Sequence, residues 1–344
     1  VFATNLRNLL LQPPLTNHKV LAIDPAFRTG CKIAVLDELG DLLTNTTVYP
    51  HDPQNEKNKA KKIIINLIKE YNLKLIAIGN GTACRETEII ISELIEELDQ
   101  NLKYIIVNEA GASVYSASNI ALEEFPNLDV SMRGAISIGR RLQDPLAELV
   151  KINPKHIGVG MYQHDVSQSK LEISLENVVE SVVNYVGVDV NTASSSLLEY
   201  IAGIKSNVAK NIVQYRQDNN KITNLQELKN VYRLGPKTFT QAAGFLKIRD
   251  ADYPLDRTSI HPESYQAAEQ LIEKFYFEVQ DLLDKEKLKE LEKKLKEVDL
   301  SQLIEQLELD VGLLTLKDIV SNLVKPDRDP REDIPKPVFR TDVL

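Results

Sequence analysis

The sequence contains few cysteines and no excess of basic residues, and both shortages limit what the protein does. Cys31 and Cys84 are its two cysteines. Because Cys31 falls inside an expected strand, we expect reduced thiols in a cytoplasmic protein rather than a disulfide framework. Lysine and arginine total 41 against 50 acidic residues, a formal net charge of −9. Nucleic acid would therefore bind at local sites rather than through a basic field over the whole surface.

Long apolar runs are missing as well. No run reaches the ~20 residues that a bilayer span requires, so no membrane partner is expected. The opening residues, VFATNLRNLLLQPPL, lack a basic region followed by a small-residue cleavage site, and no secretory signal is predicted. The chain begins without Met and ends abruptly, so we expect a piece of a longer protein, with a helical remnant at residues 1–18.

Strand and helix patterns alternate from about residue 19 to residue 121. Apolar runs bounded by turn residues predict strands, and apolar residues at helical spacing predict helices. The expected strands are 20–25, 31–37, 41–50, 73–81 and 103–111; the expected helices are 55–72, 85–98 and one from 113. Three strands followed by helix–strand alternation are typical of an RNase H-like domain with a mixed five-stranded sheet. A doubly wound nucleotide-binding sheet would alternate from its start, and no G-x-G-x-x-G follows the first strand.

Three acidic residues are candidates for a metal site. Asp24 and Glu109 follow the first and fifth strands, whose ends meet at one edge of such a sheet. Asp144 precedes Pro145 at an expected helix start. Three carboxylates can hold a pair of divalent ions ~4 Å apart for phosphodiester cleavage. The structural alternatives are a turn aspartate, a strand-end glutamate and a helix N-cap.

The loop after the fourth strand is a candidate phosphate site. It precedes a helix, so free backbone N–H groups there would suit a phosphate, although a plain glycine-rich turn is the alternative. Asn80 and Gly81 also stand where RNase H-like nucleases often carry a second carboxylate, and neither replaces a carboxylate on Mg²⁺. The residues of this loop are Gly79, Asn80, Gly81 and Thr82.

The second half of the chain contains a repeated helix–glycine–helix pattern. A break at Gly203 and another at Gly235 are offset by 32 residues and predict tandem helix-hairpin-helix units within 191–250. Glycine lets backbone amides approach a phosphate, and the helix that follows adds its partial positive charge. A plain helical connector is the alternative, and the repetition favours binding. The expected nucleic-acid-binding residues are Gly203, Lys205, Ser206, Lys210, Arg233, Gly235, Lys237 and Thr238.

Several long motifs resemble the Tex family of transcription accessory proteins. They are DPAFRTGCK, IGNGTACRETE, NEAGASVYSAS, ISIGRRLQDPLAELVKI, GVGMYQHDVSQ and LDRTSIHPESY. The resemblance covers nearly the whole chain and implies a YqgF-type RNase H-like domain, then helix-hairpin-helix units, then an OB-fold RNA-binding domain beginning after Leu344. One departure is Ala26, where the motif usually has glycine; if that position needs positive φ, alanine costs on the order of 1 kcal/mol.

The expected organisation follows from these segments. The YqgF-type domain spans 19–145, a connector 146–190, the tandem hairpins 191–250 and a helical region 251–324. Within the helical region, the stretch after residue 284 balances lysines with acids and is interpreted as a solvated face. Residues 325–344, rich in proline and charge, are predicted to be a linker to the absent OB-fold domain.

Together these features favour a nucleic-acid-binding transcription accessory factor that contacts RNA or DNA backbones with little sequence specificity. No cofactor is expected to be required. The alternative is a metal-dependent nuclease or resolvase that uses Asp24, Glu109 and Asp144 with Mg²⁺ or Mn²⁺. The missing carboxylate at Asn80 and Gly81 favours binding over catalysis. A third hypothesis is an interaction platform for the transcription or translation machinery.

Overall fold

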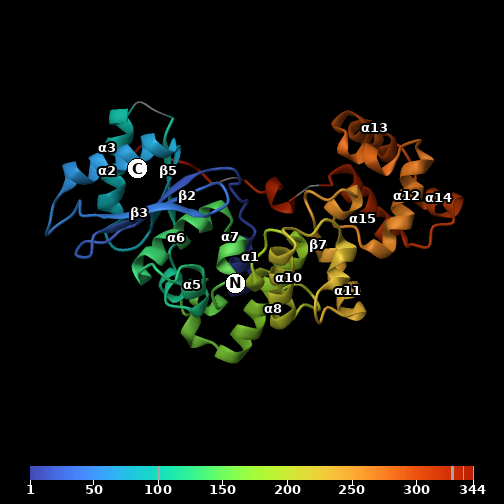
Figure 1. Ribbon diagram of the computed structural model, residues 1–344, viewed down its shortest axis with the longest axis horizontal. Helices are drawn as coiled ribbons and strands as arrows, with labels where there is room; N and C mark the ends of the chain where they lie inside the picture. Colours follow the sequence, from blue (N-terminus) through green and yellow to red (C-terminus); the bar gives the residue numbers. More distant parts are fainter. Residues whose placement is uncertain (99–100, 327–328, 336, 344) are drawn as a thin grey trace. The chain divides into compact units, whose positions relative to one another are not determined.

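The computed structural model places the chain in two units (Figure 1). The structure describes residues 1–98, 101–326, 329–335 and 337–343. The first unit comprises residues 1–179 together with 331–344, and the second comprises residues 180–330. Within the described residues, no helix is both long enough and apolar enough to cross a membrane.

The first unit is built on a mixed five-stranded sheet, as the sequence predicts. Its spatial order is β3-β2-β1-β4-β5, with β1, β4 and β5 parallel and with β2 antiparallel to both β1 and β3. The central strands read as unbroken apolar runs because helices cover both faces of the sheet. The strands are β1 Val20–Asp24, β2 Cys31–Leu36, β3 Leu42–Val48, β4 Leu75–Gly79 and β5 Lys103–Val107.

Two apolar clusters, one on each face, hold the sheet between its helices (Figure 1). On one face lie α2 (Lys57–Tyr71) and α3 (Cys84–Leu98), whose buried residues recur at helical spacing. On the other face lies α6 (Val130–Gln143), which packs on β1 and β2. Gly139 permits this approach, since a Cβ there would lie 2.9 Å from the Ala22 Cβ.

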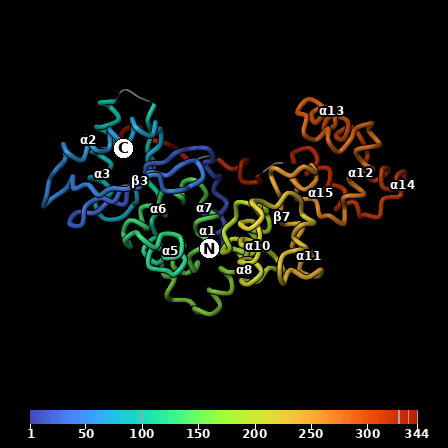
Figure 2. The backbone as a smooth tube through the Cα atoms, in the orientation of Figure 1, coloured from blue at the N-terminus to red at the C-terminus, as the bar shows by residue number. Residues whose placement is uncertain are grey.

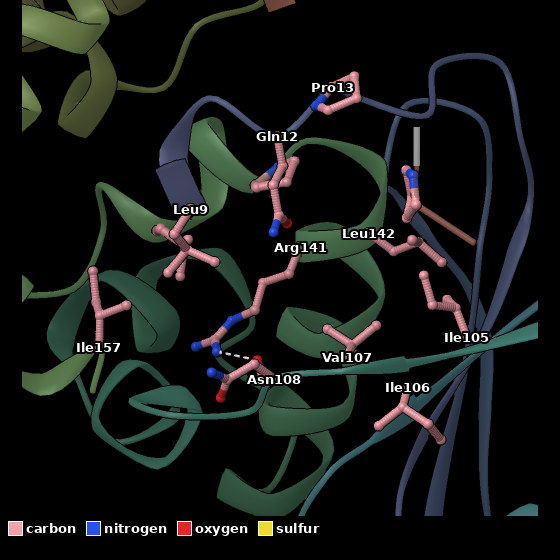
Figure 3. Close-up of a pocket in the computed structure, with 13 residues that line it drawn as sticks. Leu9, Gln12, Pro13, Ile105, Ile106, Val107, Asn108, Arg141, Leu142 and Ile157 are labelled. Carbon is pink, nitrogen blue, oxygen red and sulfur yellow. Dashed lines mark hydrogen bonds between the residues drawn. The ribbon is translucent and has the colours of Figure 1, made fainter. Parts of the chain in front are cut away.

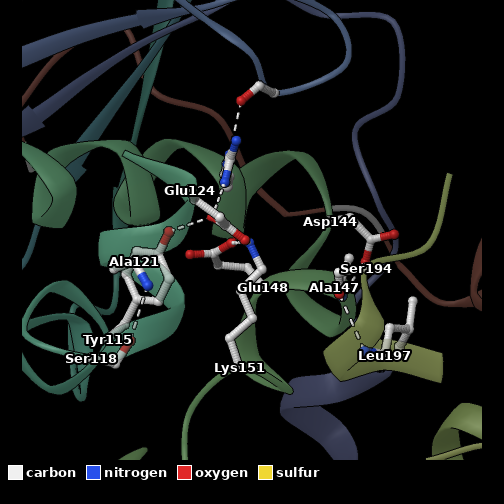
Figure 4. A network of polar contacts seen from close by, with 12 residues as sticks. Tyr115, Ser118, Ala121, Glu124, Asp144, Ala147, Glu148, Lys151, Ser194 and Leu197 are labelled. Atoms are coloured by element: carbon white, nitrogen blue, oxygen red, sulfur yellow. Dashed lines mark hydrogen bonds and ion pairs between the residues drawn. The ribbon is translucent and has the colours of Figure 1, made fainter. Parts of the chain in front are cut away.

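Short helices complete the first unit. They are α1 Phe2–Leu10, α4 Ala112–Ser116, α5 Asn119–Glu124 and α7 Pro145–Leu149, and α8 Gln168–Val186 begins in this unit. Asp144 caps α7 by accepting a hydrogen bond from the Ala147 N–H at 3.2 Å, with Pro145 at the first helical position (Figure 4). This start of α7 is the one that the sequence predicts.

The described residues from Arg331 onward belong to the first unit (Figure 2). Arg331 pairs with Asp144, their atoms Nη1 and Oδ1 being 2.7 Å apart. Arg340 forms an antiparallel bridge with Tyr104 on β5, and its guanidinium lies 3.2 Å from the Glu88 carboxylate. The sequence predicts a linker at 325–344; Arg331 and Arg340 within it instead contact the sheet domain, through partners that lie far away in sequence.

The second unit is helical apart from a two-stranded parallel ladder, β6 Val188–Asp189 with β7 Leu246–Lys247. Between these strands lie α9 Ser195–Leu198, α10 Ser206–Asp218, the 3-10 helix η3 Leu225–Asn230 and α11 Pro236–Ala242. Beyond β7 come α12 Tyr265–Lys274, α13 Lys285–Lys296, α14 Leu300–Leu307 and α15 Leu313–Val324. These last four helices share a separate apolar cluster, in which Leu295 of the charge-rich α13 is buried.

Candidate nucleic-acid interface and strand-end carboxylates

Three neighbouring parallel strands end at one edge of the sheet and bring two of the predicted acids together. β1 ends at Asp24, and Glu109 follows the end of β5. Since β1, β4 and β5 are adjacent and parallel, their carboxyl ends lie at the same edge. The negative charge of Glu109 accordingly raises the pKa of Asp24. The structure therefore places Asp24 and Glu109 in one site although 84 residues separate them (24 to 109).

The Asp24 carboxyl group lies in a half-buried position between β2 and α6. Burial, and after it the Glu109 charge, raise its pKa from 3.8 to about 6 against the opposing effect of the Lys32 ammonium. Lys32 is the cross-strand partner of Asp24 and is itself buried, donating to the backbone oxygens of Thr29 and Gly30. Gly134 of α6 faces the carboxylate, since a Cβ there would lie 3.2 Å from Asp24 Oδ2.

The loop after β4 holds the Glu109 carboxylate. A Cβ at Gly81 would lie 1.8 Å from Glu109 Oε1, and one at Gly79 would lie 2.6 Å from Glu109 Oε2. The Gly81 N–H donates to this carboxylate, and the Asn80 side chain accepts from the Glu109 N–H at 3.0 Å. The loop predicted to receive a phosphate thus already holds an anionic group of the chain itself, while Thr82 is exposed.

The third predicted carboxylate has different partners. Asp144 caps α7 and forms an ion pair with Arg331, whose side chain is 4% exposed. Within the described part of the chain, no three His, Cys, Asp or Glu side chains are arranged to hold a metal ion. Asp24 and Glu109 also have cations beside them, Lys32 and Arg141 respectively. The donor set therefore does not fit the two-ion arrangement, which requires several carboxylates free to bind Mg²⁺ or Mn²⁺.

The first hairpin turn lies between α9 and α10 in the second unit. Gly203 has a φ of +85°, a conformation that glycine adopts without strain. Ile201 and Ile204 are buried on either side of it, and the Ile204 N–H donates to the Ile201 oxygen at 2.9 Å. Lys205 stands at the N-cap of α10, and no side chain caps this helix. The first turn of α10 is therefore exposed at Lys205 and Ser206, with Lys210 one turn further on.

The second turn repeats this geometry at a different register from the predicted one. The Leu234 N–H donates to the Val231 oxygen at 3.0 Å, as Ile204 does to Ile201. Arg233, with a φ of +67°, therefore corresponds to Gly203, and Gly235 corresponds to Lys205 as the N-cap of its helix. The copies are offset by 30 residues (203 to 233), so the predicted alignment of the two glycines with an offset of 32 is wrong.

Both turns present cations to solvent. Arg233 and Lys237 are exposed, and Thr238 lies half-buried in α11. No carboxylate in the described segments lies within 4 Å of the hairpin cations Lys205, Lys210, Arg233 and Lys237. The hairpins also pack on each other, since the Asn211 side chain of α10 donates to the Tyr232 oxygen at 2.7 Å.

Sequence reasoning missed one side chain at this surface. Tyr232, whose side chain is 71% exposed, lies beside Arg233 with the guanidinium carbon 5.2 Å from its ring centroid. An aromatic residue in a turn between two buried apolar residues, Val231 and Leu234, was the available signal. It points outward because its neighbours Val231 and Leu234 take the two inward positions of the turn.

Comparison with known families assigns all three regions. Residues 18–143 match the Tex protein YqgF-like domain, and residues 183–247 match the helix-hairpin-helix motif. Residues 253–331 match a further HHH domain, in a region for which the sequence predicted helices alone. Residues 18–143 thus resemble the Tex family, and two helix-hairpin-helix matches follow them along the chain.

Several relatives are similar to the chain over nearly its full length. Protein tex of Bordetella pertussis is 46% identical over 344 residues, which cover 100% of this chain and 42% of that protein. The transcriptional accessory protein Tex of Neisseria gonorrhoeae is 48% identical over 332 residues, covering 96% and 42% respectively. S1 RNA-binding domain-containing protein 1 of Homo sapiens is 38% identical over 399 aligned residues, covering 100% and 39%. The chain thus spans less than half the length of these relatives.

Proposed function

We propose that this chain is a nucleic-acid-binding accessory factor of transcription that holds the sugar-phosphate backbone with its tandem hairpins. The observation that carries the proposal is the exposed pair of turns, in which cations surround a helix start that no side chain caps. A helix N-terminus attracts phosphate through its free N–H groups and its partial positive charge. The names of the Neisseria gonorrhoeae and human relatives, which mention transcription and RNA binding, support the same function.

The turn at Tyr232 favours a single-stranded partner. An exposed tyrosine beside backbone-binding cations can stack on an unpaired base, and such stacking contributes about 1–3 kcal/mol per base without sequence preference. In a duplex the bases are already stacked on one another, so this contribution is lost. We therefore expect single-stranded RNA or DNA to bind more tightly than duplex of equal length.

The sheet domain serves as scaffold in this proposal. At the edge of the sheet, the carboxylates of Asp24 and Glu109 lie near the cations Lys32 and Arg141 respectively. These cations already compensate the negative charge, which supports a structural role better than a catalytic one. The net charge of −9 leaves the remaining surface suited to protein contacts in the transcription or translation machinery. The proposal places the protein in the cytoplasm, consistent with the free thiols of Cys31 and Cys84.

The test is a titration of labelled single-stranded RNA and duplex DNA, read by fluorescence anisotropy at several salt concentrations. Replacing Lys205, Lys210 and Arg233 together by Gln should weaken binding at low salt. It should also reduce the slope of log K against log salt by about 0.7 for each lost phosphate contact on a single strand. The matched control replaces three exposed lysines of α13 in the same unit, Lys285, Lys289 and Lys293. Equal losses in both triple variants would refute the hairpin interface.

Two further measurements separate the remaining hypotheses. Tyr232→Ala should weaken single-strand binding by about tenfold and leave duplex binding unchanged, whereas Tyr276→Ala, which removes a side chain 96% exposed, should change neither. Strand integrity is read in the same samples with Mn²⁺ added. Cleavage that disappears in Asp24→Asn would overturn the scaffold role and establish a nuclease.

A further inference from the structure

A cavity of about 300 Å³ lies within the first unit (Figure 3). Side chains from α1, β5, α6 and α7 line it, together with Pro337 of the C-terminal segment. Most of this lining is aliphatic, including Leu9, Val107, Leu149 and Ile157. The volume falls at the lower end of the range of small-molecule sites, which are typically apolar with a few placed polar groups.

Arg141 brings a cation into this apolar lining. The residue is 5% exposed, and its Nη1 donates to the backbone oxygens of Asn108 and Ala110, both at 2.8 Å (Figure 3). Its Nε and Nη2 are buried and have no hydrogen-bond partner among the residues that the structure describes. These two nitrogens form one edge of the guanidinium plane, where their N–H bonds run parallel. That edge matches the two oxygens of a carboxylate.

The nearby acids do not neutralise this edge by contact. The negative charges of Glu148 and Glu109 both favour the charged form of Arg141. In the described part of the chain, however, neither carboxylate forms an ion pair with Arg141 within 4 Å. Glu148 pairs with Lys151 at 3.0 Å (Figure 4). Glu109 accepts from the Gly81 N–H. A buried cation with two unused donors is costly, so a bound anion would recover free energy there.

We propose that this pocket binds a small organic carboxylate, with its two oxygens on Arg141 Nε and Nη2 and its apolar body against Leu9, Leu149 and Ile157. A carboxylate fits better than a phosphate ester because Arg141 is the sole cation among the lining residues, and a doubly charged phosphate needs more donors. The proposal does not depend on nucleic-acid binding.

Hexanoate and benzoate serve as probes, with hexanol as the uncharged counterpart of hexanoate and hexyl phosphate as the phosphate arm. Each is titrated into the full chain by isothermal titration calorimetry, and thermal unfolding provides an independent readout. We expect at least one carboxylate to bind and to raise Tm, with hexanol at least about tenfold weaker, as loss of a charge-assisted pair implies. Failure of both carboxylates, equal binding of hexanol or preference for hexyl phosphate would each overturn the proposal.

Two variants test the site from different sides. Arg141→Met removes the guanidinium and should reduce carboxylate affinity by about tenfold or more. Arg141→Met also removes two hydrogen bonds to the backbone, which can disturb the fold by itself. Leu9→Trp therefore provides a second test, in which a larger side chain fills the cavity from a half-buried position on α1. Asn8→Trp, an exposed neighbour on the same helix, is the matched control and should bind like the unmodified chain. Carboxylate binding that survives in Leu9→Trp would place the site elsewhere.

Discussion

Replacing Asp24 by asparagine should stabilise the protein at neutral pH and have little effect in acid. Burial is the main reason that the folded-state pKa of this carboxyl rises from 3.8 to about 6. Below pH 3.8 both the folded and the unfolded states hold the proton, so ionisation costs nothing. Between pH 3.8 and pH 6 the unfolded chain ionises first, and the folded state loses relative stability as the pH rises. Above pH 6 this penalty is complete.

The size of the effect follows from the shift. A change from 3.8 to about 6 corresponds to about 2–3 kcal/mol, allowing for partial solvent access to the carboxyl. Asparagine keeps the shape and never ionises, so Asp24→Asn should gain about this much at pH 8. Urea unfolding of both proteins between pH 4 and pH 8 measures the difference. Asp41→Asn, at an exposed aspartate just before β3, should change stability by less than about 0.5 kcal/mol throughout.

The same titration in a Glu109→Gln background separates the two causes. The Glu109 charge is the second contribution to the raised pKa of Asp24, after burial. Without that charge, the gain from Asp24→Asn at pH 8 should shrink but persist. A gain that is independent of pH, or a loss of stability at pH 8, would refute the assignment of Asp24 as a carboxyl penalised by its surroundings.

Two further predictions concern the hairpin register and the C-terminal segment. Gly203→Ala should cost about 1–2 kcal/mol in urea unfolding because φ there is +85°, whereas Gly235→Ala, with no atom near its Cβ position, should change stability by less than about 0.5 kcal/mol. Equal costs would contradict the corrected register. Asp144→Ala should cost about 2–4 kcal/mol, since it removes a helix cap and a partner of a buried arginine. Asp129→Ala, which removes a cap and an exposed hydrogen bond from the Ser131 hydroxyl but no ion pair with a buried arginine, should cost about 1 kcal/mol by the same measurement.

The sheet domain was predictable because its signals are local. Apolar runs and helical spacing identify the strands and their order, and parallel pairing then brings Asp24 and Glu109 to one edge. The destination of Asp144 was not predictable, because its ion-pair partner Arg331 lies 187 residues further along the chain. The helix cap at Asp144 was predictable, because it depends only on the residues that directly follow Asp144 in the sequence.

The hairpin register failed for a different reason. Sequence shows where glycines stand but not which residue takes a left-handed conformation, and in the second copy that residue is Arg233. The alignment of Gly203 with Gly235 therefore followed residue type rather than backbone geometry. The pocket around Arg141 was equally invisible, because its lining comes from four elements and a C-terminal proline that only the fold assembles.

The bridge between Tyr104 and Arg340 has a consequence for the behaviour of the protein in concentrated solution. β5 is an edge strand of the sheet, and an uncovered edge offers unpaired backbone groups to any other extended chain. Here the Tyr104 N–H donates to the Arg340 oxygen, and the Arg340 N–H donates to the Tyr104 oxygen, both at 2.9 Å. The returning segment thus occupies this part of the edge and guards the sheet against self-association and aggregation.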